Sequence, residues 1–386
     1  MWNFFGDTCE KIRKIQEDML ETNGYHWEKY TVTTEDGYIN TIYRIPYSHN
    51  IKTNNNERRP PVILSHGMTC CSAVFLNQCQ LGYYLADQGY DVWLPNNRGT
   101  TFSRKHVILD PEKDKDKYWN FSWHEIGVYD IPAFVDLVIE KTSFQKVYYI
   151  GHSQGTTALA VFLSERPEYN DKIMLSCLMG SVISMDEGVK ANVVTLLKYF
   201  MVPLIKLVDR HLFRIHVIPF SNTIRAMSPL LSWNSIGRYI SMKSLYYMTG
   251  YENFEQATQL DLTKFCQTMP NTSSIGQLLH YMQNIQSKKF TKYDYGPEKN
   301  LEKYGSTEPP LYDLKKVTSP VALFYGKNDM FNNYKTDNLD KKLGNVVYTH
   351  VVEDDGFNHI DFLIAKDSVP LLYKHIVEIM KRYQES

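Results

Sequence analysis

A serine stands between two glycines in the pentapeptide Gly-His-Ser-Gln-Gly at positions 151–155. An apolar run at 146–150 predicts a buried strand before it, and 156–164 predicts a helix after it. A sharp turn from strand to helix leaves no space for side chains beside the apex, which accounts for Gly151 and Gly155. The alternative is an ordinary tight turn, since glycine and serine are common in turns. The strand and the helix favour Ser153 as the nucleophile of an elbow.

A serine hydroxyl is a weak nucleophile at neutral pH, so it needs a histidine base and an acid that orients the base. After such an elbow these partners follow in the chain order acid, then histidine. Asp329 follows a predicted strand at 321–325, and His359 follows one at 346–352. Three other carboxyl groups lie so near His359 in sequence that a separate strand end is not expected for them: Asp354, Asp355 and Asp361.

Attack on an ester also needs N–H donors for the oxyanion that forms. The backbone N–H of Gln154, directly after the nucleophile, is the first expected donor. The second is expected in the loop after an early strand, where Gly67 allows close approach and Met68 offers its N–H. His66 and His152 flank this region and are expected to pack or to form hydrogen bonds rather than to act as bases.

Alternating strand and helix patterns surround these residues. A hairpin is predicted over 29–45, and a βαβ unit follows with strands at 61–65 and 90–94 and a helix at 75–88. Further helices are expected after Asp130 and at 369–383, and a strand at 173–183. This rhythm predicts a mostly parallel sheet flanked by helices. It stops over 184–317, so we expect a core formed by 1–183 and 318–386 and a largely helical insertion between them.

Composition excludes several classes of protein. The 386 residues include 42 Lys and Arg against 43 Asp and Glu, so no net field exists to attract nucleic acid. The six cysteines show neither the density of a disulfide framework nor the spacing of zinc ligands. No metal site and no cofactor are expected. The apolar segment 191–208 is interrupted by Lys198, Pro203 and Lys206, which indicates buried helices or an interfacial surface rather than a membrane span.

Taken together, the motifs resemble those of the acid lipase group of α/β-hydrolases, which includes lysosomal acid lipase, gastric lipase and the steryl ester hydrolases. Nearly the whole chain takes part in the resemblance, through short motifs at 23–25, 33–38, 65–68, 89–94, 97–99, 103–106, 121–125, 151–156, 293–296, 309–310 and 358–362. The resemblance implies the α/β-hydrolase fold, with Ser153, Asp329 and His359 as nucleophile, acid and base. It also implies that 184–317 is a cap with a lid over an acyl-chain pocket.

The implied activity is hydrolysis of neutral lipid esters, triacylglycerol or steryl ester, through an acyl-enzyme. Two alternatives stay open: a carboxylesterase or thioesterase acting on smaller or soluble esters, and a non-catalytic lipid-binding protein. Peripheral contact with a lipid droplet or membrane surface would run through the cap. The first twenty residues lack the long apolar run of a signal peptide, so an intracellular location is expected, with a lysosomal or secreted one as the alternative that the resemblance implies.

Overall fold

The computed structural model describes residues 2–48, 58–77, 80–184, 217, 235–250, 255–257 and 260–384, without the side chains of 2–8 and 247–248. The expected segment 191–208 lies outside these residues, as does Cys79. The other five cysteines, Cys9, Cys70, Cys71, Cys177 and Cys266, are buried. Within the described residues, no helix combines the length and the apolar character that a membrane crossing requires.

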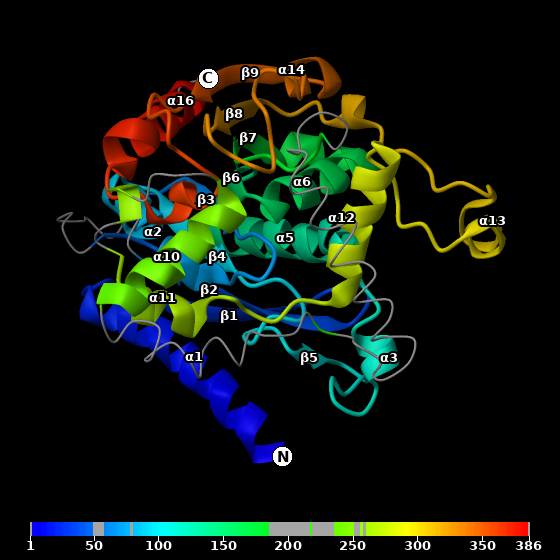
Figure 1. Cartoon of the computed structure of the whole chain (residues 1–386), viewed down its shortest axis with the longest axis horizontal. Helices are drawn as coiled ribbons and strands as arrows, with labels where there is room; N and C mark the ends of the chain where they lie inside the picture. The colour runs from blue at the N-terminus through cyan, green and yellow to red at the C-terminus, as the bar shows by residue number, and fades with distance from the viewer. Residues whose placement is uncertain are drawn as a thin grey trace.

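A mixed sheet forms the centre of the molecule (Figure 1). Its strands lie in the order β1-β2-β4-β3-β6-β7-β8-β9, and β5 pairs with β2. The pairs β1–β2 and β2–β4 are antiparallel, and every pair from β4 to β9 is parallel, as the alternating pattern predicts. The strands are β1 (Glu28–Thr33), β2 (Tyr38–Ile45), β3 (Pro61–Ser65), β4 (Asp91–Pro95), β5 (Lys105–His106), β6 (Val147–His152), β7 (Ile173–Met179), β8 (Val321–Tyr325) and β9 (Val346–Val351).

The central strands are apolar on both faces because helices cover both. Successive side chains of a strand point to opposite faces, so Val62 and Leu64 of β3 pack into one core while Ile63 packs into the other. One core includes side chains of α2 (Leu81–Asp87) and α16 (Lys374–Gln384). The other includes side chains of α5 (Ile131–Thr142) and α6 (Gln154–Glu165). The expected layered architecture is therefore confirmed.

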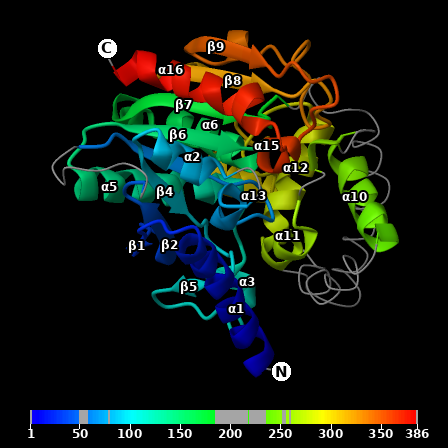
Figure 2. The ribbon, with the colours of Figure 1, turned by 90° about the vertical axis from the view of Figure 1, so that its left-hand side faces the viewer.

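Between β7 and β8 the chain contributes helices and no strand of the central sheet, within the described residues. Figure 2 shows α10, α11 and α12 together at one side of the sheet. The α-helices described in this stretch are α10 (Ser235–Thr249), α11 (Leu262–Thr268), α12 (Ile275–Ser287) and α13 (Pro297–Tyr304). Other α-helices of the described residues are α1 (Trp2–Thr22), α3 (Lys115–Tyr118), α4 (Trp123–Glu125), α14 (Leu339–Lys342) and α15 (Asp361–Ile364).

Some elements differ from those expected. The helix expected at 75–88 is a 3-10 turn at Ser72–Phe75 followed by the shorter α2. The strand expected at 173–183 ends at Met179, because Gly180 adopts φ +57, which is incompatible with a strand. The N-terminal helix α1 was not expected at all, and it extends beyond the body of the molecule toward the N-terminus (Figure 1).

Candidate active site

Ser153 lies at the junction of β6 and α6 with φ +54 and ψ −120, a strained conformation for a residue with a side chain. The two neighbouring glycines make this turn possible. A β-carbon at Gly155 would lie 2.4 Å from the Ser65 carbonyl oxygen, and one at Gly151 would lie 2.9 Å from the carbonyl carbon of Gly155. The expected strand, sharp turn and helix are therefore all present, and the strand and helix are packed too closely for larger residues.

His359 and Asp329 form a buried hydrogen-bonded pair. The His359 Nδ1 lies 2.8 Å from the Asp329 Oδ2, and both side chains are almost completely shielded from solvent. The other carboxylate oxygen, Oδ1, accepts a hydrogen bond of 2.8 Å from the backbone N–H of Phe331. Because Nδ1 donates its proton to the carboxylate, the neutral imidazole has its lone pair on Nε2, which is the tautomer that a general base needs.

The three other carboxyl groups near His359 have different partners. Asp361 accepts a hydrogen bond from the Tyr246 hydroxyl. Asp354 accepts hydrogen bonds from the Gln256 side chain and from the backbone N–H of Gly356. Asp355 is exposed and forms an ion pair of 2.6 Å with Lys327. The structure thus brings Asp329, and none of these three carboxylates, to the Nδ1 of His359.

Backbone hydrogen bonds and close contacts bring Ser153 to the same end of the sheet as His359 and Asp329. The N–H of Ser153 donates to the Met179 carbonyl (3.2 Å) at the end of β7. Directly after it, a β-carbon at Gly180 would lie 3.1 Å from both the Asp329 Oδ2 and the His359 Nδ1. His152, the residue before the serine, donates through Nε2 to the carbonyl of His359 (3.0 Å). The carboxyl ends of β6, β7 and β8 therefore converge on one site, as expected for a parallel sheet.

The loop after β3 contacts Ser153 directly. A β-carbon at Gly67 would lie 3.0 Å from the Ser153 Cβ, so a larger residue at this position would have to displace the serine by a few tenths of an ångström. Met68 follows in this loop, and Gln154 is the first residue of α6, where helical N–H groups have no partner within the helix. Both residues expected to supply N–H donors therefore lie beside the nucleophile.

His66 orients this loop through both of its ring nitrogens. Its Nδ1 donates to the carbonyl of Gly67 (2.9 Å), and its Nε2 accepts the backbone N–H of Asn97 (3.2 Å). Burial lowers the pKa of His66 to about 4, so the ring is neutral at pH 7. The Gly67 carbonyl and the Met68 N–H belong to one planar peptide, so fixing the first fixes the direction of the second.

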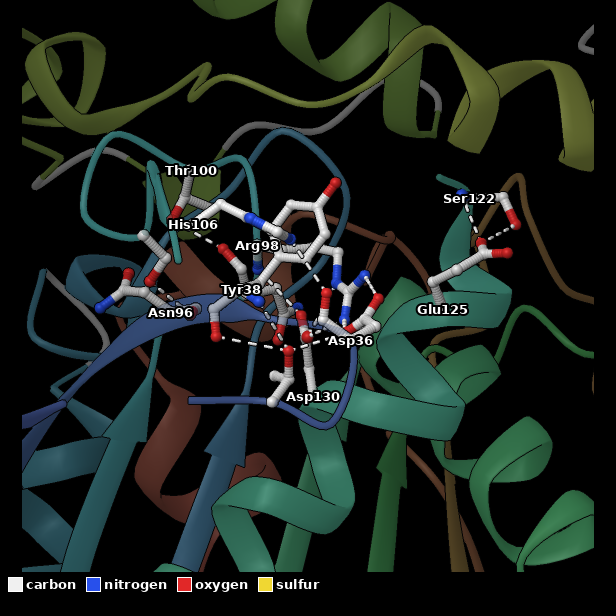
Figure 3. A network of polar contacts seen from close by, with 12 residues as sticks. Asp36, Tyr38, Asn96, Arg98, Thr100, His106, Ser122, Glu125 and Asp130 are labelled. Carbon is white, nitrogen blue, oxygen red and sulfur yellow. Dashed lines mark hydrogen bonds and ion pairs between the residues drawn. The ribbon is translucent and has the colours of Figure 1, made fainter. Parts of the chain in front are cut away.

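Next to Asn97, a buried ionic cluster anchors the loop after β4 (Figure 3). The guanidinium of Arg98 contacts Asp36 at 2.6 Å and Asp130 at 2.8 Å, and it lies 4.0 Å from the centre of the Tyr38 ring. Burial raises the pKa of Asp130, whereas for Asp36 the interaction with Arg98 outweighs burial and lowers the pKa. The sequence motif 97–99 gave no sign of this role.

The segment between β7 and β8 packs against the elbow from the other side. Gln154 donates to the Gln277 side chain (2.6 Å), and the Thr157 hydroxyl lies 2.7 Å from that of Tyr281. Thr69 donates its N–H to Ser273 (3.0 Å). Below them, the ring of His280 stacks on Trp123 at 3.6 Å between ring centres. Helix α12 is thus fixed over the start of α6, a contact that the sequence did not reveal.

No group of three or more His, Cys, Asp and Glu side chains in the described parts of the chain is arranged to hold a metal ion. The arrangement of serine, histidine and aspartate needs none for acyl transfer. Such an arrangement can perform nucleophilic attack by a hydroxyl, with proton transfer through an imidazole.

Comparison with known families gives two matches. Residues 60–364 match the model described as alpha/beta hydrolase fold, and residues 16–79 match the model described as partial alpha/beta-hydrolase lipase region. The two matched ranges together cover nearly all of the elements described above.

Several characterised relatives align along most of the chain. Lipase 3 of Drosophila melanogaster is 36% identical, with 95% of this chain and 93% of the relative aligned. Lipase 1 of the same organism is 32% identical over 96% of this chain and 80% of its own length. Gastric triacylglycerol lipase of Bos taurus is 32% identical over 94% of this chain and 90% of its own.

Solved structures resemble the fold at low sequence identity. A putative lipase from Sulfolobus solfataricus superposes with a TM-score of 0.61 at 12% identity, covering 92% of this chain and 94% of the other. A putative lipase from Acinetobacter baumannii gives a TM-score of 0.52 at 14% identity, covering 97% of each chain. At these identities the superpositions concern the fold alone.

Proposed function

This chain belongs to the lipases of the alpha/beta-hydrolase family and is a carboxylic ester hydrolase, and from that premise we propose that Ser153, His359 and Asp329 catalyse the hydrolysis of neutral lipid esters. The observation that carries the proposal is the 2.8 Å pair of His359 and Asp329 at the same sheet edge as the strained Ser153. Triacylglycerol and steryl ester are the proposed substrates.

In the proposed reaction, the Ser153 hydroxyl attacks the ester carbonyl carbon while the His359 Nε2 accepts its proton. The backbone N–H groups of Met68 and Gln154 stabilise the oxyanion, and Asp329 stabilises the imidazolium without taking its proton. The bond to the alcohol then breaks, and the alcohol leaves with the proton from His359. Water repeats the attack on the acyl-enzyme, which releases the fatty acid and restores Ser153.

We propose that 184–317 forms a cap on a core of 1–183 and 318–386, and that its described part includes a wall for the acyl chain. The side chains of Leu278 and Met282 on α12 are buried against Met68, the residue assigned as an oxyanion donor. Apolar side chains beside the oxyanion site favour an acyl chain over a small polar substituent. This contact supports a lipid ester over the smaller soluble esters.

We further propose that α10 contacts a lipid droplet or membrane surface. Ile236, Tyr239 and Ile240 have the i, i+3, i+4 spacing of one helix face, and they are 69%, 48% and 57% exposed. Exchanging Ile236 and Ile240 for serine is expected to weaken binding to a triolein emulsion without changing hydrolysis of a soluble ester. Leu301→Ser, at an exposed position of α13, is the matched control and is expected to bind like wild type.

The test of the reaction compares wild type with Ser153→Ala on triolein, cholesteryl oleate and a short soluble ester. Wild type is expected to hydrolyse at least one lipid ester and to be labelled by an organophosphonate at Ser153, and the variant to do neither. The control is Ser176→Ala, a buried serine of β7 whose hydroxyl has no partner among the described residues. Full activity of Ser153→Ala would exclude the mechanism, and hydrolysis of the short ester alone would exclude the lipid substrate.

A further inference from the structure

The carboxyl end of α10 lies directly on the two loops that carry the acid and the base. The carbonyl of Thr249 accepts the backbone N–H of His359 itself, at 3.3 Å. At the next residue, a β-carbon on Gly250 would lie 2.4 Å from both the carbonyl oxygen of Asn328 and the Cβ of Asn358. Asn328 directly precedes Asp329, and Asn358 directly precedes His359. The end of α10 therefore lies against the chain next to the acid and next to the base.

A second contact joins α10 to the His359 loop through buried side chains. The Tyr246 hydroxyl donates to the Asp361 Oδ1, and the Asp361 Oδ2 accepts the backbone N–H of Asn358 (2.8 Å). The Asn358 side chain in turn accepts the backbone N–H of Ile360 (2.9 Å). The loop 358–361 is therefore closed on itself by hydrogen bonds on both sides of His359, and Tyr246 joins it to α10 in addition to the Thr249 carbonyl.

Burial makes this connection costly to lose. Tyr246 and Asp361 are both buried, and desolvation raises the pKa of Asp361 to about 7. A buried carboxylate needs donors to offset its lost hydration, and Tyr246 supplies one of the two described above. His152, at the end of β6, donates to the carbonyl of His359. The backbone of the base is thus held at its carbonyl by β6 and at its N–H by α10.

We propose that Tyr246 is a positioning residue for the base: docking of α10 on the 358–361 loop, through Tyr246 and Asp361, sets the alignment of His359. This inference rests on the proposed function, because it assigns His359 as the base. Tyr246 touches neither Ser153 nor His359 in the contacts described, so it acts through Asp361 and the backbone.

The first test is Tyr246→Phe, which removes the hydroxyl and keeps the ring. The turnover number on a short soluble ester, divided by the number of sites that an organophosphonate labels, is expected to fall about three- to tenfold. The KM for that ester is expected to stay within about twofold. A merely structural role would lower the labelled fraction and the melting temperature and would leave the turnover of each labelled site unchanged.

The matched control is Tyr169→Phe. Tyr169 is also a buried tyrosine that donates to a carboxylate, the Asp136 Oδ2 at 2.7 Å, and it belongs to the 3-10 turn before β7. Because Asp136 is exposed, loss of this hydrogen bond is expected to cost less stability than loss of the buried Tyr246–Asp361 bond, and it is expected to leave turnover per labelled site unchanged. Equal losses of turnover in Tyr246→Phe and Tyr169→Phe would overturn the inference.

A second variant, Gly250→Ala, tests the docking without touching Tyr246. The added methyl group forces α10 away from the loops that precede Asp329 and His359, so turnover per labelled site is expected to fall more than tenfold. Unchanged turnover per labelled site in both Tyr246→Phe and Gly250→Ala would refute the inference. Failure of the wild type to hydrolyse esters or to be labelled would instead refute the proposed function.

Discussion

Gly180 offers a direct way to perturb the acid and the base without changing either. A β-carbon at this position would lie 3.1 Å from the Asp329 Oδ2 and 3.1 Å from the His359 Nδ1, closer than ordinary van der Waals contact. In Gly180→Ala, these atoms, now 2.8 Å apart, must therefore move by a few tenths of an ångström. Because catalytic groups tolerate little displacement, we expect kcat/KM on a short soluble ester to fall about tenfold.

The backbone conformation adds a separate cost to stability. Gly180 has φ +57, where alanine costs about 1 kcal/mol more than glycine. Gly305 has φ +70 and no atom within 4 Å of its potential β-carbon, so Gly305→Ala carries the strain without the crowding. Urea unfolding should show a loss of about 1 kcal/mol in both variants, and the ester assay should show a loss in Gly180→Ala alone. Full activity of Gly180→Ala, or an equal loss in Gly305→Ala, would refute the reasoning.

Three further predictions concern charge. Asp329→Asn is expected to lower kcat about 10⁴-fold on a soluble ester: the Phe331 N–H retains the amide oxygen, so the amide NH2 faces the His359 Nδ1 and favours the tautomer with its proton on Nε2. A loss under tenfold would contradict the assignment. Burial lowers the pKa of His280 to about 3, so below about pH 6.5 the unfolded chain binds a proton that the native protein does not. As the pH is lowered from about 6.5 towards 3, the free energy of unfolding of wild type is therefore expected to decrease by about 1.4 kcal/mol per pH unit more than that of His280→Gln. Equal pH slopes of the two proteins in urea unfolding would contradict this. Arg98→Met leaves Asp130 and Asp36 without their cation and is expected to destabilise the protein by about 3–5 kcal/mol by urea unfolding, whereas a loss under 1 kcal/mol would show that the carboxyl groups simply become protonated.

The sequence was sufficient to predict the positions of residues that are recognised from their neighbours in the chain or from their order along it. Ser153 is flanked by its own strand and helix, and Asp329 and His359 each follow a predicted strand, so three separate patterns place them at one sheet edge. Spacing of side chains cannot show what Asn97, Gly180 and Tyr246 do, because their contacts join segments that meet only after the sheet and the elements around it have packed. None of these three has a chemical signature that would draw attention in the sequence.

Helix α1 illustrates a different reason for failure. Ile12, Gln16 and Leu20 are spaced four apart and are all buried, so they form the inner face of a helix. The middle position is polar, which interrupts the apolar stripe that predicts an amphipathic helix. The structure supplies the missing reason: the Gln16 side chain donates to the hydroxyl of Ser72 (2.9 Å), so it is buried with a partner. A satisfied polar group in a core contact cannot be recognised before its partner is known.

The cluster around Arg98 shows what such buried polar groups can contribute. Two carboxylates and a guanidinium taken out of water cost desolvation energy, and well-packed apolar side chains would stabilise a core at least as well. Apolar side chains, however, would not fix the orientation of the loop backbone, because their contacts are not directional. Arg98 binds the turn at Asp36 and the start of α5 at Asp130, and its own N–H also donates to Asp130 (2.9 Å), so the backbone of its loop has one orientation.

Asn97 directly precedes Arg98 in this loop, and its N–H is the one that His66 accepts. His66 in turn holds the carbonyl of Gly67 and thereby aims the Met68 N–H. We infer that the ionic cluster contributes geometry to the oxyanion site more than it contributes stability to the fold. A donor for the oxyanion works only if it is already aimed before the charge develops, and under the proposed function the contacts that run from Asp130 to Met68 would supply that aim.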